Sequence, residues 1–155
     1  LSLEKSIPVR SPYSVRPWQH VLEPLGGYLL LAERLFKRQS KLLLDKRLIY
    51  NPFSTPFNFG PNKDSNRSVI DLVKEILIHW PGKWRDLSRE NDLHEAGRLQ
   101  LQIDKAFTSL HWSPKWTFYK TVKRTVDWYR KTNNNSISPI DACVEDINEY
   151  QNESF

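Results

Sequence analysis

The chain has 155 residues, of which 39% are hydrophobic and 26% charged, a composition typical of a single globular domain and unlike that of a wholly disordered chain. Its apolar runs fall short of the roughly 20 residues that cross a bilayer, so a membrane protein is not expected. Cys143 is the only cysteine, which excludes an internal disulfide and favours a reducing compartment such as the cytoplasm.

The net charge of +5 is spread among acidic residues and forms only short pairs, Lys37 with Arg38 and Lys46 with Arg47. Such pairs favour a solvated face over a patch that binds nucleic acid. The sequence contains no methionine, even at position 1, which predicts a processed chain or a piece of a longer protein.

The N-terminal part predicts two extended segments, Ile7–Arg10 and Val15–His20, and then a helix over about 24–39 that begins at Glu23 and Pro24. Residues 40–49 either prolong this helix or form a second element. Apolar side chains recur at helical spacing and predict one buried face: Leu25, Tyr28, Leu29, Ala32, Leu35 and Phe36.

The middle of the chain predicts a short strand at Phe57–Pro61 and a second one at Lys83–Asp86. Between them, Ser68 and Asp71 have the spacing of a capping box and predict a helix to about Trp80.

Three further helices follow, with expected caps at Asp104, Thr117 and Ser138. Cys143 is expected in the core, not as a nucleophile. The side chains expected to face inward are Ala106, Phe107 and Leu110, then Phe118, Val122, Thr125, Val126 and Tyr129, and last Ile140, Val144 and Ile147.

These elements predict a helix-rich α+β fold with about five helices and a few short strands. The alternating βαβ pattern of a nucleotide-binding sheet is missing. Gly26 and Gly27 lie inside a helix, so they are expected to allow close packing and not to cradle a pyrophosphate. The four histidines lack metal-ligand spacing, and no metal site is predicted.

The segment before the first helix carries Arg16, Trp18 and His20. An arginine and aromatic side chains at a strand end could hold an anionic ligand against the helix, because the guanidinium binds phosphate oxygens in pairs. The alternative is an ordinary strand–helix connection with a solvated Arg16.

The stretch Arg16-Pro-Trp-Gln-His-Val-Leu-Glu-Pro-Leu-Gly-Gly-Tyr-Leu29 resembles a signature of the CDP-glucose 4,6-dehydratases, which belong to the extended short-chain dehydrogenases/reductases. Further matches run in the family's order, so the resemblance covers about residues 9–150: Phe57–Pro61, His94–Ala96, Lys105–Ala106, Leu110–Trp112, Pro114–Trp116 and Thr125–Arg130. It implies that residues 1–155 form one C-terminal nucleotide-sugar-binding lobe without the Rossmann sheet.

In the family, NAD takes a hydride from C4 of the sugar, water leaves across C5 and C6, and the hydride returns at C6. The family's catalytic tyrosine lies four residues before a lysine; Tyr119 and Lys123 have this spacing, but on a helix where the family's motif does not lie. No catalytic residue is therefore predicted, and no NAD is expected to bind this chain alone.

The resemblance places Arg16 near the pyrophosphate of a nucleotide sugar, with Trp18 and His20 beside it. His94 and Glu95 match a loop that closes over the nucleotide. Arg98 is a candidate second phosphate clamp, although relatives carry a tyrosine there, and Gln102 stands where they have aspartate. Asn58 or Asn62 is a further candidate contact to the nucleotide.

The favoured hypothesis is therefore a fragment of an NAD-dependent nucleotide-sugar epimerase/dehydratase that retains nucleotide-sugar binding, with a CDP-hexose as the expected ligand. A separate Rossmann half or self-association is the expected protein partner. The alternatives are a non-catalytic interaction or pseudoenzyme module and, last, a basic nucleic-acid-binding domain.

Overall fold

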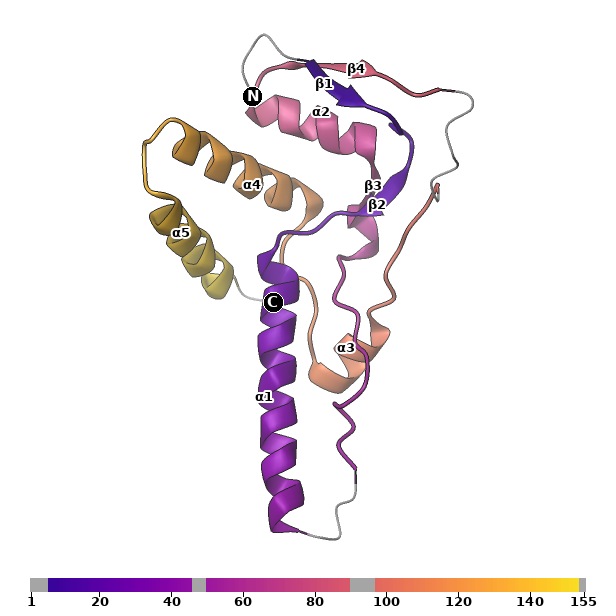
Figure 1. Ribbon diagram of the computed structural model, residues 1–155, viewed down its shortest axis with the longest axis vertical. Helices are drawn as coiled ribbons and strands as arrows, with labels where there is room; N and C mark the ends of the chain where they lie inside the picture. The colour runs from indigo at the N-terminus through magenta and orange to yellow at the C-terminus, as the bar shows by residue number, and fades with distance from the viewer. Residues whose placement is uncertain (1–5, 46–49, 90–96, 154–155) are drawn as a thin grey trace.

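The computed structural model describes residues 6–45, 50–89 and 97–153. Five helices and only short strands occur within them, so the prediction of a helix-rich α+β fold is confirmed (Figure 1). The elements in chain order are β1 (Ser6–Val9), β2 (Val15–Pro17), α1 (Leu22–Leu44), a 3-10 turn η1 (Lys63–Ser65), β3 (Asn66–Ser68), α2 (Val69–His79), β4 (Lys83–Asp86), α3 (Asp104–Leu110), α4 (Phe118–Asn133) and α5 (Pro139–Asn152).

The strands form two separate pairs. β1 and β4 are parallel, with Ser6 opposite Lys83, and β2 and β3 are antiparallel, with Val15 opposite Ser68. No larger sheet is present in the described residues, so the helices supply most of the framework.

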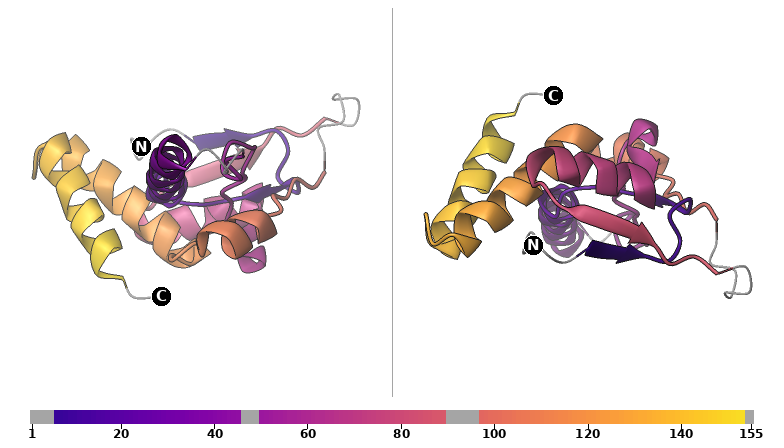
Figure 2. Two further views of the ribbon diagram at one scale, coloured as in Figure 1. Left: turned by 90° about the horizontal axis from the view of Figure 1, so that it is seen from below. Right: turned by 90° about the horizontal axis from the view of Figure 1, so that it is seen from above.

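Helix α1 is the longest element and extends away from the other helices and strands (Figure 1). It continues to Leu44, so the first part of the ambiguous stretch 40–49 prolongs it, while residues 46–49 lie outside the described structure. The chain then returns along α1, where the Asn51 side-chain amide donates to the Leu35 carbonyl at 3.3 Å. Views from below and above show α4 and α5 on one side of α1 and β1 and β4 on the other (Figure 2).

Two apolar clusters form the core. The first surrounds Phe59 and receives α1 through Leu30 and Leu31; its buried members are Phe59, Ala106, Leu110 and Trp112. The second lies between α2 and α4, around buried Phe118, Val122 and Val126, and includes Trp18 from the end of β2. Residues on both sides of the β2–α1 junction thus reach separate parts of the core.

The predicted buried face of α1 is wrong for several of its residues. Leu25, Tyr28, Leu29 and Phe36 are exposed, and the fully buried side of the helix carries Glu23 and Gly27 instead. The physical reason is that α1 has apolar side chains around most of its circumference, so periodicity alone does not select the buried side.

The same error occurs elsewhere. Ile140, Val144 and Ile147 of α5 and Tyr129 of α4 are exposed, and Cys143, expected in the core, is exposed too. Helix α5 instead buries Ala142 and Asp146, because an ion pair and not an apolar stripe joins it to α4.

The predicted helix starts agree with the structure better than the predicted buried faces, because helix caps depend on hydrogen bonds between near neighbours in the sequence. Ser68 and Asp71 form the predicted capping box, and Thr117 and Ser138 cap α4 and α5 as expected. Asp104 lies one residue inside α3, where Ile103 holds the cap position. The strand predicted at Phe57–Pro61 is absent, since no neighbouring strand pairs with it in the described residues.

Close packing between α1 and the first cluster requires glycine at position 27. An added Cβ there would lie 2.3 Å from Cδ1 of Phe59, well inside van der Waals contact, which confirms the predicted packing role of this glycine.

We predict that Gly27→Ala lowers the free energy of unfolding by about 1–3 kcal/mol through overpacking. Chemical denaturation measures this value. The control Gly97→Ala adds a methyl group into open space and should change stability by less than about 0.5 kcal/mol; equal effects would contradict the packing argument.

Candidate functional site

Three of the residues predicted to bind a ligand, Arg16, Trp18 and His20, lie in the β2–α1 junction, the segment from Arg16 to Glu23. Here the chain leaves a two-stranded pair and enters the long helix within a few residues.

Arg16 lies in the middle of β2, directly opposite Arg67 of β3. Directly opposed residues of an antiparallel pair project from the same face, so two guanidinium groups share one face of this pair. Arg16 is half-buried, and its Nη1 donates to the Val15 carbonyl at 2.9 Å, while Nε of Arg67 donates to the Asp64 carbonyl at 2.8 Å. Two adjacent arginines favour an anion, because guanidinium groups bind carboxylate and phosphate oxygens in pairs.

Arg98 lies on the other side of β2. The Val15 amide donates to the Gly97 carbonyl at 2.8 Å, and the Leu99 amide donates to the Val15 carbonyl at 3.1 Å. This parallel bridge pairs Arg98 with Val15, so Arg98 projects on the face opposite to Arg16. The structure thus brings Arg98 next to the strand but not onto the same face as Arg16. His94 and Glu95, the other two predicted contacts from this segment, lie outside the described residues.

Trp18 and Gln19 brace the junction. The Trp18 indole Nε1 donates to the Arg67 carbonyl at 2.9 Å, and Gln19 Nε2 donates to the Phe59 carbonyl at 2.9 Å. The position of Trp18 is therefore coupled to that of Arg67, and its ring packs on the α2–α4 cluster. The remaining candidates, Asn58 and Asn62, are exposed; Asn58 donates to the Gln102 carbonyl at 3.4 Å.

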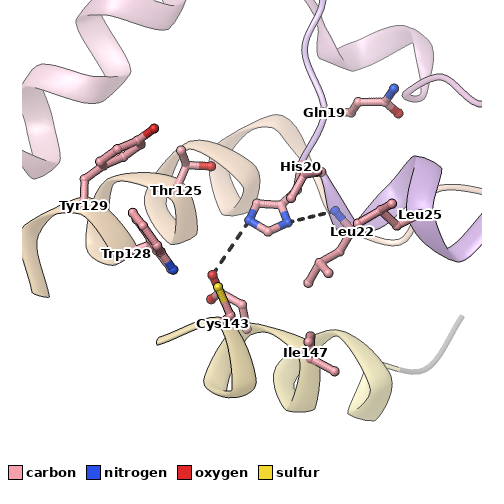
Figure 3. Close-up of a pocket in the computed structure, with 11 residues that line it drawn as sticks. Gln19, His20, Leu22, Leu25, Thr125, Trp128, Tyr129, Cys143 and Ile147 are labelled. Atoms are coloured by element: carbon pink, nitrogen blue, oxygen red, sulfur yellow. Dashed lines mark hydrogen bonds and ion pairs between the residues drawn. The ribbon is translucent and has the colours of Figure 1, made fainter. Parts of the chain in front are cut away.

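His20 is buried between α1, α4 and α5 (Figure 3). Its Nδ1 accepts from the Leu22 amide at 3.3 Å, so the proton of the neutral ring lies on Nε2, which is 3.9 Å from an Asp146 carboxylate oxygen. Asp146 is itself bound by Arg124, whose Nε donates at 2.8 Å. Burial lowers the pKa of His20 below its ordinary value; Asp146 opposes this shift and Arg124 adds to it. His20 therefore orients the junction as a neutral ring.

Glu23 is the most buried charged residue of the junction, with no exposed surface. One carboxylate oxygen accepts from the Trp116 amide at 2.7 Å, both accept from the Lys115 amide, and the second accepts from the Tyr150 hydroxyl at 2.8 Å. Burial, together with the bond to Glu23, raises the pKa of Tyr150 above its ordinary value. One side chain in the first turn of α1 thus joins the loop before α4 to the end of α5.

Two open grooves flank the junction. The first, of about 580 Å³, lies between α1, α4 and α5; its lining includes His20, Leu25, Trp128, Cys143 and Ile147 (Figure 3). The second, of about 430 Å³, lies between α2 and α4 and includes Trp18 and Trp80. Both are lined mainly by apolar side chains, and Arg16 lines neither of them. The paired arginines therefore lie on the strands, apart from these two grooves.

Tyr119 and Lys123 have the family's spacing, but their side chains are not placed together in a catalytic site. The Tyr119 side chain is exposed on α4, and Lys123 Nζ is bonded to Asp127 at 2.9 Å. The described residues contain no cluster of three or more metal-ligating side chains, and none of their helices is long and apolar enough to span a membrane.

The described residues do not form the glycine-rich turn that a dinucleotide requires. Binding of its pyrophosphate requires a glycine-rich turn between a strand and a helix, so that the backbone approaches the phosphates. Gly26 and Gly27 lie within α1, and their open sides face Tyr150 and Phe59. These glycines serve helix packing, and no step that involves NAD is assigned to this chain.

Three residues of the site were not among the predicted site residues: Gln19 and Glu23 of the junction, and Arg67 of β3. Arg67 directly precedes the capping box, but its pairing with Arg16 depends on a strand, β3, that no periodicity indicates. The sequence did indicate that Glu23 lies at a helix start, because it directly precedes a proline and acidic residues are favoured at helix N-termini. Its burial could not be anticipated from that preference.

Comparison with known proteins relates the chain to nucleotide-sugar dehydratases in sequence and in structure. CDP-glucose 4,6-dehydratase of Salmonella typhimurium is 39% identical over 124 residues, which are 79% of this chain and 31% of that protein. dTDP-glucose 4,6-dehydratase from Bacillus anthracis, solved in complex with NAD, matches with a TM-score of 0.58 at 20% identity, over 84% of this chain and 36% of that one. No family model matches the sequence.

The resemblance read from the motifs is confirmed by the sequence relative, and the structural neighbour shares the fold. The chain spans about a third of the length of both proteins.

Glu23 provides the first test of the junction. We predict that Glu23→Gln lowers the free energy of unfolding by about 2–4 kcal/mol, because an amide presents only one acceptor oxygen to several buried donors. The control Glu33→Gln replaces an exposed glutamate of the same helix that pairs with Lys37, and should cost less than about 0.5 kcal/mol. Denaturant unfolding compares the two; similar values would contradict the anchoring role of Glu23.

His20 provides the second test. Because its pKa is lowered in the folded protein, its contribution to stability is present above the ordinary value of about 6.5 and is lost as the pH falls below it. His20→Asn retains an acceptor for the Leu22 amide and removes this titration, so its stability should fall less steeply between about pH 7 and 5. An NMR titration of the His20 ring gives its pKa directly, and a value at or above 6.5 would refute the burial argument.

Proposed function

Because this chain is related in sequence to part of a CDP-glucose 4,6-dehydratase, we propose that it is the nucleotide-sugar-binding portion of an enzyme of that kind. The proposed ligand is a CDP-hexose, bound through its pyrophosphate. The observation that carries the proposal is the placement of Arg16 and Arg67 opposite each other on one face of the β2–β3 pair.

The geometry supports this assignment in two ways. Two guanidinium groups on one face match the paired oxygens of a pyrophosphate, and planar forks give the geometric specificity that point charges lack. The Arg67 carbonyl also accepts from the Trp18 indole, whose ring packs on the α2–α4 cluster, so the strand pair that carries the two arginines is held in place before a ligand binds.

We propose further that the chain does not catalyse dehydration by itself. Hydride transfer requires NAD and an activated tyrosine, and the glycines of this chain and the Tyr119–Lys123 pair do not form those sites. The relative's remaining length, about two thirds of that protein, is the proposed source of the catalytic part. Such a part could belong to a longer chain or to a separate protein.

The second candidate function is a non-catalytic interaction module. The exposed apolar side chains of α1 favour it, because large contiguous apolar surfaces mark sites of protein association. The two functions are compatible on one chain, since the arginine face and the exposed apolar side chains involve different residues.

Calorimetric titration with CDP-glucose tests the proposal. We expect saturable binding that weakens roughly tenfold or more in Arg16→Ala and in Arg67→Ala, because each loses a charge-assisted contact to phosphate. Arg16→Lys should recover only part of the affinity, since lysine lacks the planar fork. The control Arg85→Ala removes an exposed arginine from β4, outside the site, and should bind as the parent does. Absence of binding to CDP-, UDP- and dTDP-sugars would overturn the proposal.

A further inference from the structure

We propose that helix α5 is a strap held to the rest of the chain by charge, that it is released without unfolding of the other helices, and that its release loosens the β2–α1 junction. The α5 strap is defined here as α5 together with Glu153, the residue at its C-cap. Every contact of this switch is made within the chain and no ligand takes part, so the switch is independent of nucleotide-sugar binding.

Little apolar surface holds the α5 strap in place. Of the 14 residues of α5, only Ala142 and Asp146 are buried. The large aliphatic side chains of the helix are exposed: Ile140, Val144 and Ile147. Burial of apolar surface, which supplies most of the docking energy of an ordinary helix, therefore contributes little here.

Ion pairs of one polarity hold the strap instead, because α4 supplies the cations and the strap supplies the anions. The pairs run antiparallel along the two helices: Lys131 with Glu145, Arg124 with Asp146, and Lys120 with both Glu149 and Glu153. Lys115, in the loop before α4, adds hydrogen bonds from Nζ to the main-chain carbonyls of Tyr150 at 3.2 Å and of Glu153 at 2.9 Å. The docking of the strap is therefore mainly electrostatic.

Electrostatic docking makes the strap sensitive to salt. The Debye length falls from about 10 Å at 0.1 M salt to about 3 Å at 1 M, so exposed pairs weaken as the salt concentration rises. Lys131 and Glu145 are such a pair, with 42% and 48% of their side chains exposed. The pair of Arg124 and Asp146 is largely buried, and a buried charge that loses its partner is strongly destabilising. The strap is therefore expected to leave as a unit.

The strap holds the start of α1 through Tyr150. The Tyr150 hydroxyl donates to Oε2 of Glu23 at 2.8 Å, and its ring packs on Trp116 with the ring centroids 5.3 Å apart. Asp146 also lies 3.9 Å from Nε2 of His20. Release of the strap removes a donor from the Glu23 carboxylate, which has no exposed surface in the docked state. The first turn of α1, and with it the end of β2, then loses order.

The connection between α4 and α5 permits such a release. It consists of residues 134–138, in which Asn135 adopts the left-handed conformation with φ 52°. Helix α5 also has its own cap, because the Ser138 side chain accepts from the Asp141 amide at 3.1 Å and Pro139 is the first helical residue. The start of α5 thus does not depend on α4, and the helix can separate from α4 at this loop.

Hydrogen exchange of the full chain, measured peptide by peptide, tests the release. At about 0.05 M sodium chloride, the amides of α5 should be less protected than those of α2, because the strap opens by itself. At about 1 M, protection in α5 should fall roughly tenfold while that in α2 stays the same. Equal protection of the two helices at low salt, or an α5 that does not respond to salt, would overturn the proposal.

Charge reversal on α4 provides the matched variants. Lys120→Glu should lower the protection of α5 roughly tenfold, and that of residues 23–27 with it, because it opposes Glu149 and Glu153. The control Lys123→Glu makes the same change of charge on the same helix, where Lys123 pairs with Asp127 of α4. Protection of α5 should stay within about twofold of the parent in this control. Equal losses in both variants would contradict the strap, and circular dichroism checks that each retains its helices.

Two further variants separate the docking of α5 from its effect on the junction. Lys131→Glu and Glu145→Lys should each lower the protection of α5, and the double variant that carries both should recover it; a double variant as weakly protected as the single ones would refute the pairing. Tyr150→Phe keeps the ring and the ion pairs but loses the bond to Glu23. It should lower the protection of residues 23–27, and an unchanged value there would refute the link between the strap and the junction.

Discussion

The buried carboxylate of Glu23 is the constraint on which the arrangement of this molecule depends. It enters the structure from the first turn of α1 and satisfies main-chain donors of Lys115 and Trp116 and the hydroxyl of Tyr150, which lie more than 90 residues away in sequence. A buried charge is tolerated only when hydrogen-bond donors surround it. The bonds to Glu23 therefore fix the first turn of α1 against the loop before α4 and the end of α5. Because β2 directly precedes this turn, the orientation of Arg16 follows from the same contacts.

Some side chains of the junction hold neighbouring elements in place, and others are proposed to bind a ligand. His20 Nδ1 accepts from the Leu22 amide, Gln19 Nε2 donates to the Phe59 carbonyl, and the Trp18 indole donates to the Arg67 carbonyl. The guanidinium groups of Arg16 and Arg67 share one face of the β2–β3 pair, which these bonds brace, and guanidinium is the group that binds phosphate oxygens in pairs. This rigidity matters because affinity for an anion rises when the donors are held in place before binding. The relationship to a nucleotide-sugar dehydratase gives this face its proposed ligand.

Local signals in the sequence were sufficient for much of the fold. The caps at Ser68, Thr117 and Ser138 depend on hydroxyl-to-amide bonds between near neighbours, and the Gly27 packing role followed from its place inside a helix. The predictions failed where contacts distant in sequence determine the structure. The buried side of α5 carries Asp146, which binds Arg124, while Ile140 is exposed. The strand predicted at residues 57–61 does not form, because no strand of the described chain pairs with it. For the site, the motif gave Arg16, but Arg67 required the β2–β3 register, which joins positions 51 residues apart.

Helix α1 exposes apolar side chains from Leu25 to Leu44, and the chain spans about a third of the length of the relatives it matches. The account's central claim is nevertheless about the arginine face, and an amide and side-chain NMR titration with CDP-glucose tests it most directly. The account predicts shifts confined to the Nε–H groups of Arg16 and Arg67, the Trp18 indole and the neighbouring β2 and β3 amides. Shifts centred on the groove between α1, α4 and α5, or none at saturating ligand, would contradict it.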